Sequence, residues 1–77
     1  MNLHRIDICS PPDREQLVAA ICYDNEQWAE LNQEKVELVL EIYARHDGNA
    51  WVFPFDEAIT ALCDAKKRLL DGSGFAK

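Results

Sequence analysis

The segment VELVLEIYAR, residues 36–45, constrains the fold of this chain more than any other stretch. Every even-numbered position in it is apolar, whereas glutamate, tyrosine and arginine recur at the odd-numbered positions. Because successive side chains of a strand point to opposite faces, this alternation predicts a β-strand with one buried face. Helical phasing would scatter the same apolar residues around a cylinder. Residues 36–45 are therefore expected to pair in a sheet.

Weaker patterns predict further strands on both sides of this segment. Residues 3–9 alternate imperfectly, and residues 27–32 place Ala29 and Leu31 on one face. Residues 16–24 are apolar on both parities, which suits an interior strand, although periodicity alone does not exclude a helix there. Residues 50–53 can add a short strand before Pro54. The connecting turns are expected at SPPDRE (10–15), DNE (24–26), QEK (33–35) and DGN (47–49), the last because Gly48 accepts a positive φ.

The period changes from two to helical spacing at Phe55. Asp56 and Glu57 fall in the predicted first turn and residues 66–68, all basic, in the predicted last turn, which complements the helix dipole at both ends. Gly72 is a suitable helix stop. Residues 72–77 are then expected to form a flexible C-terminal tail.

These elements predict an α+β fold. It is an antiparallel β-meander of four to five strands, with one C-terminal helix packed on one face, in a single domain over residues 1–71. A helix of about sixteen residues covers one side of such a sheet, so the reverse side is expected to stay open.

The distribution of charge favours a basic protein as the partner. The net charge of the 77-residue chain is −6, and residues 24–41 hold six acidic residues against the single base Lys35. Such a field repels nucleic acid and anionic membrane surfaces and attracts basic proteins. We therefore expect neither direct nucleic-acid binding nor membrane association.

No apolar run approaches the roughly 20 residues that cross a membrane. The start MNLHRIDIC lacks the features of a signal peptide, so a cytoplasmic location is expected. Cys9, Cys22 and Cys63 are odd in number and far apart, which favours buried or half-buried free thiols and argues against a disulfide or zinc site. No metal site and no cofactor are predicted.

Catalytic function is not expected. Glu30, Glu37 and Glu41 are carboxylates, but a catalytic pair needs a desolvating pocket that a sheet of this size does not offer. His4 and His46 are predicted to be ordinary exposed residues rather than bases. The sequence contains no phosphate-binding loop and no nucleophile elbow.

Alternation places aromatic and acidic side chains together on the face opposite the helix. Two readings stay open for Trp28 and Tyr43: cross-strand neighbours that stabilise the sheet, or anchors for a partner that the carboxylates steer. One of Trp51 and Phe53 is expected to pack under the helix and the other to border this surface. The candidate partner-binding residues are Trp28, Glu30, Glu37, Glu41, Tyr43, Asp47 and Trp51.

Residues 26–70 resemble small bacterial immunity proteins of polymorphic-toxin and contact-dependent growth inhibition systems. The resemblance is carried by EQWAEL, by the acidic strand ending EIYAR, by the DG turn with a tryptophan after it, and by the helix DEAI..L..AKKRLL. It implies a cytoplasmic antidote that binds the toxin domain of its own system and blocks the toxin's active site. The partner is then a cognate toxin, expected to be basic and of the nuclease type.

Two other classes of function remain open from the sequence. One is an acidic phage-type inhibitor that mimics nucleic acid. Gene order distinguishes it from an immunity protein, whose gene lies directly downstream of a toxin gene. The other is a small module that dimerises through its open sheet face or edge strand. The free protein is expected to be a monomer or a weak homodimer.

Overall fold

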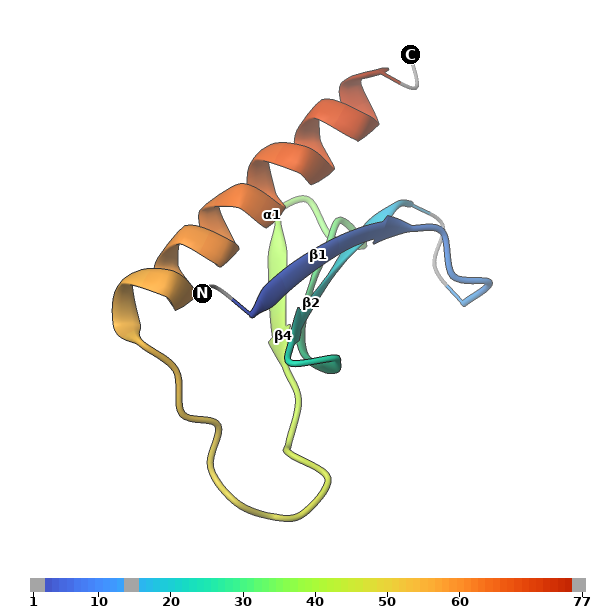
Figure 1. Cartoon of the computed structure of the whole chain (residues 1–77). Helices are drawn as coiled ribbons and strands as arrows, with labels where there is room; N and C mark the ends of the chain where they lie inside the picture. Colours follow the sequence, from blue (N-terminus) through green and yellow to red (C-terminus); the bar gives the residue numbers. More distant parts are fainter. Residues whose placement is uncertain (1–2, 14–15, 76–77) are drawn as a thin grey trace.

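Figure 1 shows the computed structural model, in which one helix crosses a small antiparallel sheet. The structure describes residues 3–13 and 16–75, with the side chains of residues 72–75 left out. Its strands are β1 (His4–Cys9), β2 (Val18–Tyr23), β3 (Glu26–Asn32) and β4 (Val39–Ile42), and its helix is α1 (Phe55–Phe75). The strands are ordered β1-β2-β3-β4, and each is antiparallel to the next. The predicted α+β meander with a C-terminal helix is confirmed.

The last predicted strands are shorter in the structure. β4 covers residues 39–42 rather than 36–45, because its partner β3 ends at Asn32, which pairs with Val39. Residues before Val39 therefore have no strand to pair with. Residues 50–53, expected to add a short fifth strand, are irregular and lead from the bottom of the sheet to α1 (Figure 1).

The turn between β2 and β3 follows its sequence closely. Tyr23 pairs with Glu26, and the two residues between them, Asp24 and Asn25, have φ angles of 51° and 68°. Two consecutive positive φ values are typical of a type I′ turn, whose twist matches that of the flanking strands. Asn and Asp tolerate this backbone better than other non-glycine residues. Arg5 Nη1 also donates to Asn25 Oδ1 at 3.2 Å, which ties the turn to β1.

A β-bulge in β3 reverses the predicted orientation of Trp28. Ile21 pairs with Ala29, but Cys22 pairs with Gln27, so Trp28 is the extra residue of the ladder. Its side chain is 5% exposed and joins the core cluster beneath the helix. The prediction that Trp28 shares the open face with Glu30 is therefore wrong, because the bulge breaks strict alternation.

The core lies between α1 and the first three strands. Ala61, Ala65 and Leu69, spaced four residues apart, form the buried stripe of the helix. They meet the sheet residues Ala19, Ile21, Ala29 and Leu31. Among the described residues, α1 packs on β1, β2 and β3 but not on β4. The outer strand of the sheet is thus left without a helical cover.

The helix continues past its predicted end. It extends to Phe75, so the prediction that Gly72 stops it is wrong, and the basic residues 66–68 are not in its last turn. A glycine inside a helix costs about 1 kcal/mol relative to alanine but does not forbid the conformation. The flexibility expected of residues 72–77 stays a prediction, and residues 76 and 77 lie outside the described residues.

Substitutions in the alanine stripe test the close approach of helix and sheet. Ala65 is fully buried, so Ala65→Leu forces extra carbons into a filled space and is expected to lower the free energy of unfolding by about 1–3 kcal/mol. Lys67→Leu adds an apolar side chain to an exposed position of the same helix and should change it by under about 0.5 kcal/mol. Urea unfolding followed by circular dichroism measures both. Equal stability of the two variants would contradict this packing.

The β2–β3 turn gives a second prediction. Asn25→Ala places a side chain with no local hydrogen bond at a φ of 68°, so we expect a loss of about 1 kcal/mol in unfolding free energy. Asn25→Gly relieves the backbone constraint while also removing the Arg5 contact, and it should be the more stable of the two variants. Thermal unfolding of both variants checks the order, and the reverse order would argue against the left-handed turn.

Candidate partner-binding surface

Glu30 and Glu41 lie directly opposite each other on the face of the sheet that points away from the helix. Asn32 Nδ2 donates to both carboxylates, at 3.2 Å to Glu30 Oε2 and 2.5 Å to Glu41 Oε2. The Tyr43 hydroxyl donates to Glu30 Oε1 at 3.2 Å. Like charges placed opposite each other destabilise a sheet, and these donors offset that repulsion. Tyr43 is thus on the predicted face of the sheet, where it contacts Glu30, another candidate partner-binding residue.

This face is more closed than the sequence predicts. Glu30 is 7% exposed, and Val18, Cys22 and Asn32 on the same face are also buried. Long side chains help to cover this face. Tyr43 contacts Glu30, and Arg5 Nη2 lies 3.8 Å from Cys22 Sγ. The expectation that Glu30 is accessible to a partner is therefore wrong.

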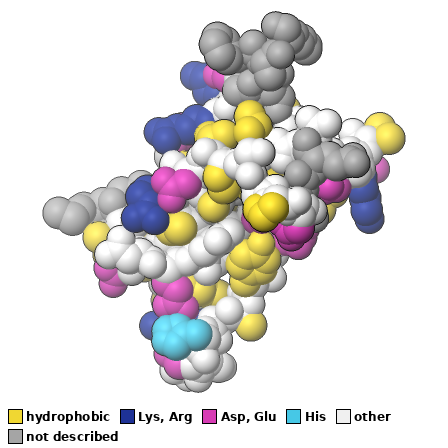
Figure 2. Space-filling model, turned by 90° about the vertical axis from the view of Figure 1, so that its right-hand side faces the viewer, with side chains coloured by type: hydrophobic (Ala, Val, Ile, Leu, Met, Phe, Trp, Pro, Cys, Tyr) yellow, Lys and Arg dark blue, Asp and Glu magenta, His cyan; other side chains and the backbone are white. Residues whose placement is uncertain are grey.

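β4 and the connections that flank it carry both acidic and apolar side chains that are accessible. Glu37 is exposed and Glu41 half-buried, and the neighbouring Val36 is completely exposed. On the helix side of β4, Leu40 and Ile42 are 43% and 64% exposed because α1 does not reach them. From the viewpoint of Figure 2, carboxylates lie beside apolar side chains across the middle of the molecule.

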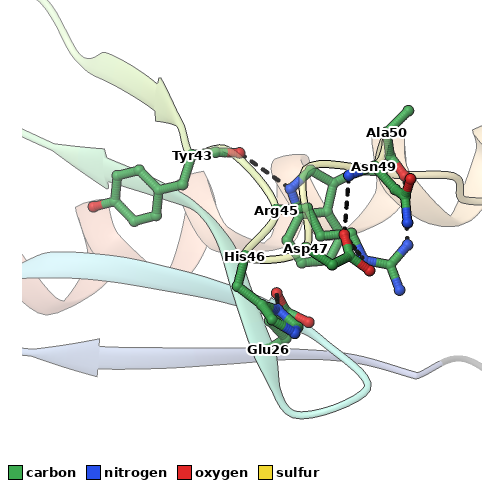
Figure 3. Close-up of polar contacts among 8 residues, drawn as sticks. Glu26, Tyr43, Arg45, His46, Asp47, Asn49 and Ala50 are labelled. Atoms are coloured by element: carbon green, nitrogen blue, oxygen red, sulfur yellow. Dashed lines mark hydrogen bonds and ion pairs between the residues drawn. The ribbon is translucent and has the colours of Figure 1, made fainter.

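The loop between β4 and α1 is braced by its own contacts (Figure 3). Trp51 Nε1 donates to the Tyr43 carbonyl at 3.1 Å, and the Arg45 guanidinium lies 5.6 Å from the centre of the Trp51 ring. Asp47 Oδ1 accepts from the Asn49 amide at 3.0 Å, which holds the pKa of the Asp47 carboxyl below its usual value. The predicted turn at Asp47 is confirmed, with Gly48 at a φ of 80°. Asp47 is exposed and Trp51 half-buried.

A cluster of rings answers which of Trp51 and Phe53 lies deeper. The Phe53 ring packs 4.7 Å from both Tyr23 and Trp28 and 5.1 Å from His4, measured between centroids. Trp51 stacks on its outer side, 5.7 Å from Phe53. Phe53 is therefore the residue that enters the core and Trp51 the one at the border. His4, predicted to be exposed, is half-buried in this cluster, and burial lowers its pKa.

An ion pair fastens the loop to the β2–β3 turn. His46 Nδ1 lies 2.6 Å from Glu26 Oε2 (Figure 3). The hydrogen bond that Glu26 accepts raises the pKa of His46, and the same bond lowers the pKa of Glu26. The His46 side chain is 75% exposed, as the sequence predicts for this residue. The sequence analysis did not predict this ion pair between His46 and Glu26, which we call the latch. It forms only because the fold brings two turns close together.

A cavity of about 210 Å³ lies beside this latch. Tyr23, Asp24, Glu26, Arg45, Trp51 and Val52 line it. Its carboxylates come from one turn, and Arg45 is already engaged with Asp47 and Trp51. Within residues 3–13 and 16–75 no group of three or more metal-binding side chains is assembled. The arrangement offers charge and ring surface for binding.

Comparisons with protein-family models, with curated proteins and with solved structures found no match for this chain. In the part of the chain that the structure describes, no helix is long and apolar enough to cross a membrane. Function is therefore inferred from the geometry of the surface itself.

The ion pair between His46 and Glu26 predicts a bell-shaped pH dependence of loop attachment. The His46 contribution is complete below its ordinary pKa of 6.5 and disappears as pH rises through the raised folded value. The Glu26 contribution is complete above its ordinary pKa of 4.5 and disappears as pH falls through the lowered folded value. The loop should therefore be held best between these two ordinary values.

Hydrogen exchange of the Trp51 indole N–H measures this attachment, because that group bonds within the same loop. We expect faster exchange, corrected for its intrinsic pH dependence, as pH rises from 6 to 9. His46→Gln should flatten this response, with His4→Gln as the matched histidine control. A response that persists in His46→Gln would contradict the latch.

Proposed function

We propose that this protein is an immunity protein, which binds the basic toxin domain of its own system and covers the toxin's active site. The observation that carries the proposal is the uncovered strand β4 with the connection before it, where the exposed Glu37 and the half-buried Glu41 lie among the exposed apolar side chains of Val36, Leu40 and Ile42. Surfaces of this kind favour partners that are both basic and apolar. The proposed contact residues are Glu37, Glu41, Tyr43, Asp47 and Trp51. Trp28 and Glu30 are left out because they are buried.

Negative charge is concentrated in one part of the fold. The segment 24–41, which forms β3, most of β4 and the connections around them, holds six acidic residues against Lys35, whereas α1 is nearly balanced, with four acidic residues against the three bases 66–68. Such an asymmetric field orients a charged partner before contact and can raise association rates by about 10- to 1,000-fold. A nuclease-type toxin is basic because it holds nucleic acid, so it would approach β4 rather than the helix.

The aromatic members of the surface are fixed before binding. Tyr43 is held by its bond to Glu30, and Trp51 by its bond to the Tyr43 carbonyl and by Arg45. Side chains that are already ordered lose less conformational entropy when a partner covers them. Tyr43 and Trp51 are therefore suited to act as anchors, since both also keep part of their surface accessible.

Co-purification from the native operon tests the proposal directly. Expression of the gene with its neighbours, followed by affinity capture of this protein, should recover a basic protein that is toxic when expressed alone. Co-expression of the two should abolish that toxicity. Capture of no such protein, or toxicity unchanged by co-expression, would refute the antidote function.

Charge reversal at the surface gives a quantitative prediction. With the partner recovered in this way, Glu37→Lys combined with Glu41→Lys should lower the association rate by about tenfold or more at low salt and flatten its salt dependence. Asp13→Lys combined with Asp71→Lys changes the net charge equally at exposed sites elsewhere and serves as the control. Surface plasmon resonance at two ionic strengths measures both. An equal effect of the two pairs would locate the binding face elsewhere.

A further inference from the structure

β4 forms one edge of the sheet, and its hydrogen-bond register shows which backbone groups face outward. The Tyr43 amide donates to the Trp28 carbonyl at 2.8 Å. Hydrogen-bonded and non-hydrogen-bonded residue pairs alternate in an antiparallel ladder. Glu41 therefore exchanges backbone hydrogen bonds with Glu30, and Val39 exchanges them with Asn32. Leu40 and Ile42 belong to the non-bonded pairs. Their N–H and C=O groups therefore point away from β3, toward the open edge.

The same two residues carry the exposed apolar side chains of β4. Leu40 is 43% exposed and Ile42 is 64% exposed, both on the helix side of the sheet. Within residues 3–13 and 16–75, the outward N–H and C=O groups of Leu40 and Ile42 make no hydrogen bond. Backbone donors, backbone acceptors and apolar surface thus coincide along one short edge.

The opposite edge of the sheet is protected in the usual ways. β1 carries the paired charges of Arg5 and Asp7, whose atoms lie 3.0 Å apart, and α1 packs along it. Charged side chains and covering helices both keep an edge strand from accepting another strand. On β4 no helix covers Leu40 and Ile42, and the single charged side chain of the strand is Glu41 between them.

We propose that β4 accepts an extended segment of the basic partner as a fifth strand of the sheet. This rests on the proposed function only in taking the partner to be a basic protein. The added segment alternates apolar and basic residues: its apolar side chains cover Leu40 and Ile42 beside the helix, and its lysine or arginine lies next to Glu41 on the other face. Backbone bonds supply affinity and the alternating side chains supply selectivity.

A second copy of this chain fits the edge poorly. The antiparallel self-pairing that uses the outward groups of both residues joins Leu40 to Ile42 of the second copy. That register sets the two Glu41 side chains directly opposite each other, which is destabilising. Each copy also carries a net charge of −6. Charge complementarity therefore selects a basic segment over self-association.

A capped synthetic peptide of alternating valine and lysine is the probe, with a valine–glutamate peptide as its control. NMR titration of the full chain should show that the lysine peptide slows hydrogen exchange of the Leu40 and Ile42 amides, and that the glutamate peptide does not. Shifts confined to other residues, or equal binding of the two peptides, would overturn the proposal. Concentration-dependent protection of these amides without any peptide would identify a second copy as the occupant and also overturn it.

Ile42→Pro separates edge pairing from the rest of the surface. Proline removes the outward N–H of position 42 and leaves the inward bonds of β4 in place, so the variant should fold, as edge strands accept proline there. We expect peptide affinity to fall about tenfold or more, because one backbone bond is lost and the ring blocks the approach. Ile42→Val keeps the N–H and should bind within about threefold of the original chain.

The co-purified partner distinguishes failure of this inference from failure of the proposed function. Equal binding of that partner to Ile42→Pro and to the original chain would overturn strand addition while leaving the antidote function intact. Loss of binding in Ile42→Pro but not in Ile42→Val would support strand addition. If no toxin is recovered and the lysine peptide still pairs with β4, the edge site stands and the antidote function fails.

Discussion

The contact between alanine residues of α1 and the sheet determines what the rest of this protein can do. Ala61 and Ala65 of the helix and Ala19 and Ala29 of the sheet belong to one buried cluster, so small side chains make up much of the contact between the two layers. Close packing of small side chains stabilises the centre of the core, but short side chains cover little of the sheet on either side of the helix. The helix consequently reaches three strands and leaves β4 bare. The accessible surface of the protein follows from this limited cover.

Aromatic rings complete the core where the helix begins. Phe53, Tyr23, Trp28 and His4 pack against one another beside the loop that enters α1. Rings of this size bury much surface with few residues, which matters in a chain of 77 residues. This packing accounts for the many aromatic residues near the turn at Asp47, with Trp51 half-buried at the border of the cluster.

The regular parts of the fold could be predicted from the sequence because each depends on local patterns. Alternation identified β4, the Asp24–Asn25 pair identified a turn, and the change of period identified the start of α1 at Phe55. The strand order and the single covered face followed from element count and helix length. None of these features depends on the detailed fit of side chains.

The errors arise where one residue depends on a distant one. The bulge that turns Trp28 inward is a mismatch in the pairing of β2 with β3. The amino-acid pattern of neither strand indicates where it occurs. Glu30 is buried by Tyr43, thirteen positions later, and β4 begins at Val39 because β3 ends at Asn32. Two of the seven candidate residues, Trp28 and Glu30, are accordingly buried rather than accessible, and the partner-binding role of the other five stays a prediction. Register and cross-strand cover are tertiary properties that single-residue patterns do not encode.

The bond from the Trp51 indole to the Tyr43 carbonyl has a consequence for solubility. The Tyr43 carbonyl accepts this bond from the loop next to the end of β4 at Ile42, and β4 is only four residues long. Stacking of many molecules into fibrils needs long, flat borders on both sides, and here one border is charged and the other is cut short. An exposed edge of this length offers few backbone groups to a neighbouring strand, which limits its tendency to stack into fibrils.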